Sequence, residues 1–238
     1  MLPRLFIFAG RFGSGKTECA ANFAVQLARG QYLTATGWTQ TPPSFNSHPT
    51  LVDLDIVTPY FRTRELGETL RPMGVAVVSP AEVGRYLDLP AISPEILGAI
   101  EQRGVLVVLD VGGDPQGARA LGQYSPYIQR QDHVVYFVVN PYRPFTDTAE
   151  GIRAAIREVE RTSRLTVSAL VSNPNMMDET HAELVLAGHR QVMDAARVVG
   201  LPVAMLGVEA SLAKAVRREV RDVPILEIRR FFDLRWTR

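Results

Sequence analysis

Cysteine is nearly absent from this chain of 238 residues, which contains one, Cys19. A single thiol excludes an intrachain disulfide framework and is typical of a reducing compartment. Long apolar runs are also missing, since no stretch approaches the ~20 residues that a membrane-spanning helix needs. The chain runs from Met1 almost directly into its first apolar run, without a signal peptide, so we predict a cytoplasmic protein.

Neither the charge balance nor the histidine content indicates a nucleic-acid or zinc-binding protein. The 26 basic and 25 acidic side chains leave a formal net charge of +1. A nucleic-acid surface needs an excess of positive charge, so we expect no nucleic-acid partner. His181 and His189 lie eight residues apart, rather than the four that place two metal ligands on one helical turn.

Short apolar runs recur along the chain and are separated by helical stretches. Most are rich in Val, Leu and Ile without polar alternation, which is typical of parallel strands buried on both faces. With no repeat or linker, we predict a single doubly wound α/β domain over residues 1–238, in which helices flank a mostly parallel sheet. Its ligands should bind beyond the carboxyl ends of the strands. The runs are 5–9, 50–54, 75–78, 105–109, 134–139, 166–171 and 203–206.

The segment GRFGSGKT fits the phosphate-binding pattern G-x-x-x-x-G-K-[ST] and lies between a predicted strand and a predicted helix over 18–29. Unpaired N–H groups at the helix start, the helix dipole and flexible glycines together favour a bound phosphate. We predict that Lys16 reaches the β- and γ-phosphates and that the Thr17 hydroxyl binds Mg²⁺. The nucleotide-binding residues predicted here are Gly10, Arg11, Phe12, Gly13, Ser14, Gly15, Lys16, Thr17 and Glu18.

Carboxylates follow two other predicted strands. Asp110 ends an apolar run, in the position of a second motif whose aspartate holds Mg²⁺. Asp53 and Asp55 lie two residues apart in an extended segment and should point the same way. Because no glutamate follows Asp110, we predict that Asp55 orients the attacking water and that Asp53 supports the water shell of the metal. Gly112 and Gly113 would form a switch segment that approaches the γ-phosphate.

Taken together, these motifs resemble the MinD/ParA family of P-loop ATPases. These proteins have a deviant Walker A motif and belong to the SIMIBI class, within the CobQ/CobB/MinD/ParA superfamily. The loop at 10–17 looks like the family's P-loop, 51–55 its second motif, 107–113 its switch II and 200–209 its closing strand and loop. Asn173 is similar to the asparagine with which the family contacts adenine, so it joins the predicted nucleotide-binding residues.

The resemblance implies ATP and Mg²⁺ as cofactors, the Asp110 strand beside the P-loop strand, and a nucleotide-dependent homodimer that acts on a protein partner. Two positions depart from the family: Arg11 replaces its signature lysine and Phe12 the following glycine. Arginine keeps the charge, so we predict that Arg11 joins Lys16 in stabilising the transferred phosphate. The Asn-Lys-x-Asp pattern of guanine-specific proteins is absent, which also favours ATP.

Two further segments and the single cysteine bear on possible partners and cofactors. The connection 30–49, which carries Trp38 and Phe45, is either a variable surface loop or a lid or partner-binding insertion. The C-terminal segment 218–238 mixes apolar and basic residues, but acidic residues interrupt it, so we predict a tail that packs on the protein or a partner rather than on a membrane. Iron–sulfur clusters need several thiolates, so with Cys19 alone we expect none.

We therefore predict a slow Mg²⁺-dependent ATPase of MinD/ParA type that acts as a nucleotide-dependent switch. Its predicted catalytic residues are Lys16, Asp55 and Arg11, and its predicted metal site is formed by Thr17, Asp53 and Asp110. One alternative is an ATP-dependent small-molecule kinase or ligase similar to dethiobiotin synthetase. The other is a nucleotide-gated adaptor without catalysis.

Overall fold

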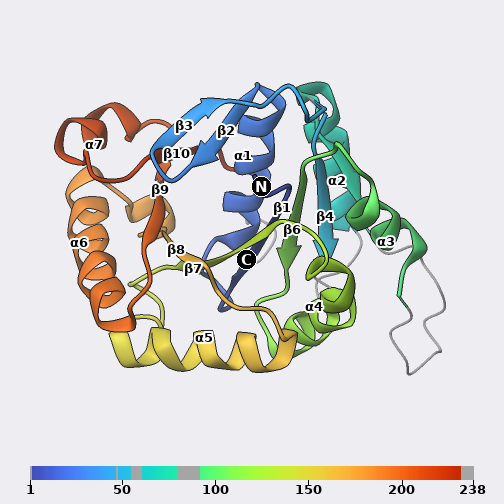
Figure 1. Cartoon of the computed structure of the whole chain (residues 1–238). Helices are drawn as coiled ribbons and strands as arrows, with labels where there is room; N and C mark the ends of the chain where they lie inside the picture. Colours follow the sequence, from blue (N-terminus) through green and yellow to red (C-terminus); the bar gives the residue numbers. More distant parts are fainter. Residues whose placement is uncertain (1, 47, 55–60, 80–91, 232–238) are drawn as a thin grey trace.

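The computed structural model describes residues 2–46, 48–54, 61–79 and 92–231. Within these residues, eight parallel strands form one sheet in the order β10-β9-β8-β7-β1-β6-β4-β5, and helices cover both of its faces (Figure 1). The strands are β1 (Leu5–Gly10), β4 (Thr50–Leu54), β5 (Ala76–Val78), β6 (Val107–Val111), β7 (His133–Val139), β8 (Ala169–Ser172), β9 (Val203–Glu209) and β10 (Ile225–Ile228).

The predicted doubly wound α/β architecture is confirmed, and each of the seven apolar runs contributes a strand. The P-loop strand β1 lies between β6 and β7, so the Asp110 strand is its neighbour, as the resemblance implied. The predicted run 105–109 lies two residues before the observed strand β6, Val107–Val111. The ladder continues through Asp110, which pairs with Phe8 of β1.

The helices are α1 (Lys16–Ala28), α2 (Phe61–Leu70), α3 (Pro94–Glu101), α4 (Pro115–Ile128), α5 (Ala149–Ser163), α6 (Ala182–Val199) and α7 (Ala213–Glu219). A separate 3-10 turn, Met177–Glu179, precedes helix α6. Helix α4 was not predicted, although Asp114 caps it by accepting a 2.7 Å bond from the N–H of Gly117, and Pro115 occupies its first turn.

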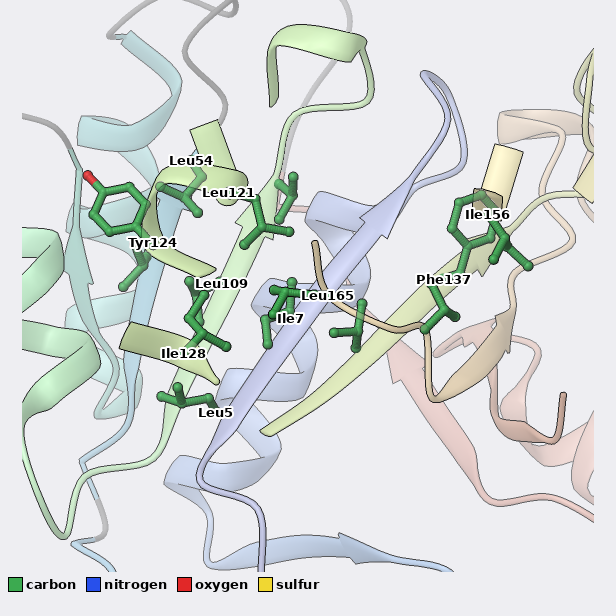
Figure 2. Close-up of a cluster of buried hydrophobic side chains, with 14 of the residues drawn as sticks. Leu5, Ile7, Leu54, Leu109, Leu121, Tyr124, Ile128, Phe137, Ile156 and Leu165 are labelled. Carbon is green, nitrogen blue, oxygen red and sulfur yellow. The ribbon is translucent and has the colours of Figure 1, made fainter. Parts of the chain in front are cut away.

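Two apolar layers hold the helices to the sheet. Odd-numbered residues of β1, such as Leu5 and Ile7, face the layer that contains buried residues of α3, α4, α5 and α6 (Figure 2). Even-numbered ones, such as Phe6 and Phe8, face α1 and residues of α2. This alternation follows from the pleat of the strand and explains why its whole length is apolar. The sheet is therefore rigid beneath the strand ends that carry the predicted site.

Half of the 30–49 segment is a regular hairpin rather than a variable loop, because Gln31–Thr34 (β2) and Gly37–Gln40 (β3) pair antiparallel. Trp38 packs on Phe23, with ring centroids 5.5 Å apart, and its indole N–H donates to the Ile225 carbonyl at 3.1 Å. Phe45 stacks on Tyr32 at 6.0 Å. These aromatic side chains extend the core, so their structural surroundings do not favour a lid.

The start of the predicted C-terminal tail packs on the protein, as β10 and the residues that follow it. The Asn22 side chain of α1 donates to the Arg229 carbonyl at 2.9 Å and accepts from its N–H at 3.0 Å. Glu18 accepts from the Phe231 N–H at 3.0 Å. In the described part of the chain, no helix has the length and apolar character required to span a membrane.

Candidate functional site: a phosphate-binding loop and its cavity

The loop between β1 and α1 has the conformation that a phosphate-binding loop requires. Gly13 and Gly15 have φ angles of 77° and 80°, in the left-handed region that glycine adopts without strain. The Lys16 side chain is folded in over the loop, since only 6% of the residue is exposed. The 13-residue helix α1 begins at Lys16, so its first N–H groups, which have no partners within the helix, lie at the end of the loop, where an anion is stabilised.

Asn173, which follows β8, braces this loop. Its Nδ2 donates to the Ser14 carbonyl at 2.7 Å in a buried hydrogen bond, and the residue is 4% exposed. A Cβ added to Gly15 would collide with this Nδ2 atom. Asn173 was predicted to contact adenine. Its amide nitrogen instead donates a hydrogen bond to the loop, and the residue also lines the adjoining cavity.

The predicted metal site is brought together beside Lys16. Asp53 and Asp110 are direct partners in the β4–β6 ladder, so both carboxylates lie on the same side of the sheet. Asp110 is 3% exposed, and Thr17 lies one residue after Lys16 in the first turn of α1. Gly113 lies against the loop, since a Cβ added there would be 2.7 Å from the Phe12 nitrogen and 2.9 Å from Lys16 Nζ.

These residues fit a magnesium ion that is held partly by a nucleotide. Among the described residues, no group of three or more His, Cys, Asp or Glu side chains is placed to hold a metal by itself. Mg²⁺ keeps several waters and usually takes one or two carboxylates plus phosphate oxygens. Asp110, the Thr17 hydroxyl and the phosphates would form such a set, with Asp53 beside it. Cys19 contributes no ligand, because burial raises the pKa of its thiol strongly.

Arg11 is held at the edge of the loop. Its guanidinium lies 2.8 Å from Glu158 of α5 and 5.2 Å from the centroid of the Phe145 ring. Phe12 beside it is 86% exposed and Phe145 is 67% exposed, so two aromatic side chains face outward next to the phosphate end of the cavity. Phe145 has a φ of 70°, a region that bulky residues rarely adopt and that costs roughly 1–3 kcal/mol.

Arg143, in the loop after β7, approaches the P-loop from another strand end. A Cβ added to Gly13 would lie 3.4 Å from Arg143 Nε. The Nε atom is buried and has no hydrogen-bond partner within the described structure. The P-loop therefore has a basic neighbour that the sequence analysis did not select as a site residue.

The far end of the cavity is organised by Arg230. Its guanidinium donates to Asp178 at 2.6 Å, to Glu209 at 2.8 Å and to the Met177 carbonyl at 2.9 Å. The hydrogen bond that Arg230 donates to Asp178 is the largest influence and raises the pKa of Arg230, as do the contacts with Glu209, while burial opposes the shift. This network joins the ends of β8 and β9 to the residues after β10.

One cavity of about 760 Å³ connects these features. The predicted residues that line it are Arg11, Phe12, Gly13, Gly15, Lys16, Thr17, Glu18, Asp53, Asp110, Gly113 and Asn173. The predicted residues Gly10, Ser14 and Gly112 do not line it. Asp55, the predicted water-orienting residue, lies outside the described residues. Glu18 lines the cavity and also accepts the hydrogen bond from the Phe231 N–H.

Four residues that line the cavity were not predicted as site residues, and they come from segments that are far apart along the chain. Arg143, Glu158, Glu209 and Arg230 all line the cavity. The position of Arg143 and Glu209 just after or at the end of strands was a usable signal, because such positions meet at one edge of a parallel sheet. Glu158 lies within α5 and Arg230 follows β10, and no local pattern marks either.

No family model and no curated protein sequence matches the chain. Solved structures do resemble it. One is the signal recognition particle receptor FtsY from Elizabethkingia anophelis in complex with GDP, with 18% identity, a TM-score of 0.51 and an alignment covering 87% of this chain and 58% of that one. Another is chloroplast FtsY from Physcomitrella patens, with 16% identity, a TM-score of 0.52 and coverages of 87% and 59%.

The chain thus spans less than two thirds of the length of these neighbours. At such low identity the likeness concerns the fold. It agrees with the predicted P-loop α/β fold, while the SIMIBI class and the narrower likeness to MinD/ParA remain predictions. The chain therefore has the α/β fold of a P-loop nucleoside triphosphatase, with a loop, a strand order and a cavity that suit a bound nucleotide.

Proposed function

We propose that this protein is a Mg²⁺-dependent nucleotide switch that binds ATP at the P-loop and hydrolyses it slowly. The observation that carries the proposal is the convergence of Lys16, Asp53, Asp110 and Gly113 on one loop, from three neighbouring strand ends. A switch needs a segment that senses the terminal phosphate. Gly113 is suited to this, because it is close to both the loop backbone and the Lys16 ammonium group.

Each residue has a role that its chemistry supports. Lys16 and the loop N–H groups neutralise the β- and γ-phosphates, and Thr17 and Asp110 are the Mg²⁺ ligands. With its phosphates bound, Mg²⁺ would supply charge neutralisation of the oxygens that gain negative charge. Asp53 orders water around the metal, and Asp55 orients the water that attacks the γ-phosphorus. Arg11 contributes charge only if it leaves Glu158.

The proposal of ATP rather than GTP rests on the base end of the cavity. Guanine presents ring and amino N–H groups, which usually donate hydrogen bonds to a carboxylate of the protein. Glu209 lines this end but is paired with Arg230 at 2.8 Å, and the sequence lacks the Asn-Lys-x-Asp pattern. GTP is the second candidate, because one structural neighbour was solved with GDP bound.

A protein partner or a second copy would act at the exposed edge of the site. Phe12 and Phe145 place apolar surface beside the phosphate end, where a contact could respond to the bound nucleotide. In the small-molecule enzyme alternative, the long 30–49 segment would line a pocket for the acceptor. This alternative has less support, since none of residues 30–46 or 48–49 lines the cavity. The adaptor alternative differs from the switch only in lacking hydrolysis.

The decisive experiment uses the two lysines of the chain as test and control. Lys16→Ala should abolish binding of MgATP in isothermal titration calorimetry, whereas Lys214→Ala on exposed helix α7 should bind as the wild type does. Titrations with MgATP, MgGTP and MgADP show whether the site prefers adenine or guanine. Gel filtration with ADP, ATP and a non-hydrolysable analogue tests dimerisation, and phosphate release tests hydrolysis. Full MgATP binding and turnover by a folded Lys16→Ala protein would refute the proposal.

A further inference from the structure

Arg143 stands apart from the other basic side chains of the cavity. It belongs to the connection between β7 and α5, and it lines the cavity together with Lys16. Its side chain lies along the P-loop, as the 3.4 Å separation between Nε and a Cβ added to Gly13 indicates. Gly13 has no side chain, so this face of the loop is open for the guanidinium to approach.

The backbone that carries Arg143 is fixed in place. The N–H of Arg143 donates to the Asn140 carbonyl at 3.1 Å, and its carbonyl accepts from the Thr146 N–H at 3.2 Å. The Thr146 hydroxyl donates to the Asn140 carbonyl at 2.8 Å, and Asn140 Nδ2 donates to the Asn175 carbonyl at 2.8 Å. A buried asparagine thus ties the Arg143 loop to the next strand end, which presents the arginine with little remaining backbone freedom.

The charges of the cavity single out Arg143. Arg11 is paired with Glu158 at 2.8 Å, and Arg230 is paired with both Asp178 and Glu209. Arg143 makes no ion pair within the described structure, and its buried Nε has no hydrogen-bond partner there. A buried donor without a partner is costly, and guanidinium groups bind phosphate oxygens through several N–H donors.

We infer that Arg143 is a phosphate-binding residue, and that it supplies the second positive charge of the site beside Lys16, in place of Arg11. The inference rests on the proposed nucleotide site and extends it. The ligand is the di- or triphosphate chain of a nucleotide, and the Nε and Nη donors of Arg143 contact its oxygens. Arg11, held by Glu158, would then be left for a contact at the outer edge of the site.

The test compares Arg143→Ala, Arg143→Met and Arg143→Lys with Arg190→Ala, whose arginine is exposed on α6. Methionine keeps the aliphatic packing beside Gly13 and removes the charge. Hydrogen bonds to charged groups contribute about 1.5–3 kcal/mol, so we expect Arg143→Ala and Arg143→Met to weaken MgADP and pyrophosphate binding about 10- to 150-fold. Arg143→Lys should recover part of the loss, and the salt dependence of binding should decrease in the Ala and Met variants.

A measurement on the wild type guards against variants that do not fold. Phenylglyoxal modifies accessible arginines, and pyrophosphate should protect Arg143 but not Arg190, as followed by mass spectrometry. Unchanged affinity in Arg143→Met, together with no protection of Arg143, would overturn the inference. If Lys16→Ala still abolishes binding in that case, the proposed function survives and only the assignment of Arg143 fails. If wild-type protein binds neither nucleotide nor pyrophosphate, both fail.

Discussion

Replacing Asn173 with alanine separates two roles that this residue could have in a nucleotide site. In the structure its Nδ2 donates to the Ser14 carbonyl at 2.7 Å, and the residue is 4% exposed. If the side chain mainly holds the P-loop in shape, its loss should weaken every ligand that uses the loop. If it mainly contacts adenine, its loss should weaken only ligands that carry that base.

The size of the effect follows from the buried bond. Removing one partner leaves the Ser14 carbonyl unsatisfied, which costs about 1–3 kcal/mol. The loop can avoid this cost by adopting another conformation that does not bind phosphate. The apparent affinity is then multiplied by the fraction of molecules that keep the binding conformation, which corresponds to a loss of up to about 150-fold. We expect a loss near tenfold, equal for MgADP, MgGDP and pyrophosphate, because the brace acts on the loop and not on the base.

Calorimetric titration of the three ligands into Asn173→Ala checks this, with Asn46→Ala on the exposed surface as the control. Circular dichroism and urea unfolding establish that the variant is folded. A loss confined to adenine nucleotides would refute the bracing role and support base contact. Unchanged binding of all three ligands by a folded variant would show that the loop keeps its shape without this bond.

Three further predictions concern the metal site, the last strand and a buried histidine. Asp110→Asn should remove the Mg²⁺ dependence of nucleotide binding while metal-free ADP binding is kept, which titrations with and without EDTA would show; retained Mg²⁺ dependence would contradict its role as a ligand. Asn22→Ala leaves the N–H and carbonyl of Arg229 without their partners at 3.0 and 2.9 Å. We therefore expect the free energy of unfolding, measured in urea, to fall by about 2–3 kcal/mol. A change below about 0.5 kcal/mol would contradict the anchoring of β10. Burial lowers the pKa of His189 and outweighs the opposing effect of Asp222, so the unfolded chain binds a proton first as the pH falls below about 6.5 and stability decreases there. His189→Gln should reduce that decrease in urea midpoints measured between pH 8 and 5.5, and an unaltered pH profile would show that another group is responsible.

The local patterns of the sequence were sufficient for the fold class and for the loop at the centre of the candidate site. The apolar run before Gly10 and the glycines after it specify a strand and a phosphate loop, because those properties depend on neighbouring residues alone. Asp53 and Asp110 could be assigned to the site because parallel strands end at one edge of the sheet. Only the tertiary structure showed that they are direct ladder partners.

The tertiary structure decided which charges face one another, since pairs such as Arg11 with Glu158 are 147 residues apart along the chain. It also placed Arg143 against Gly13, paired Arg230 with Asp178 and Glu209, and folded half of the 30–49 segment into a hairpin on the core. A side chain's partner depends on which strand ends become neighbours, and the strand order of the sheet sets that arrangement. The sequence thus determined the phosphate loop, while the packing of distant segments determined how its surroundings are charged.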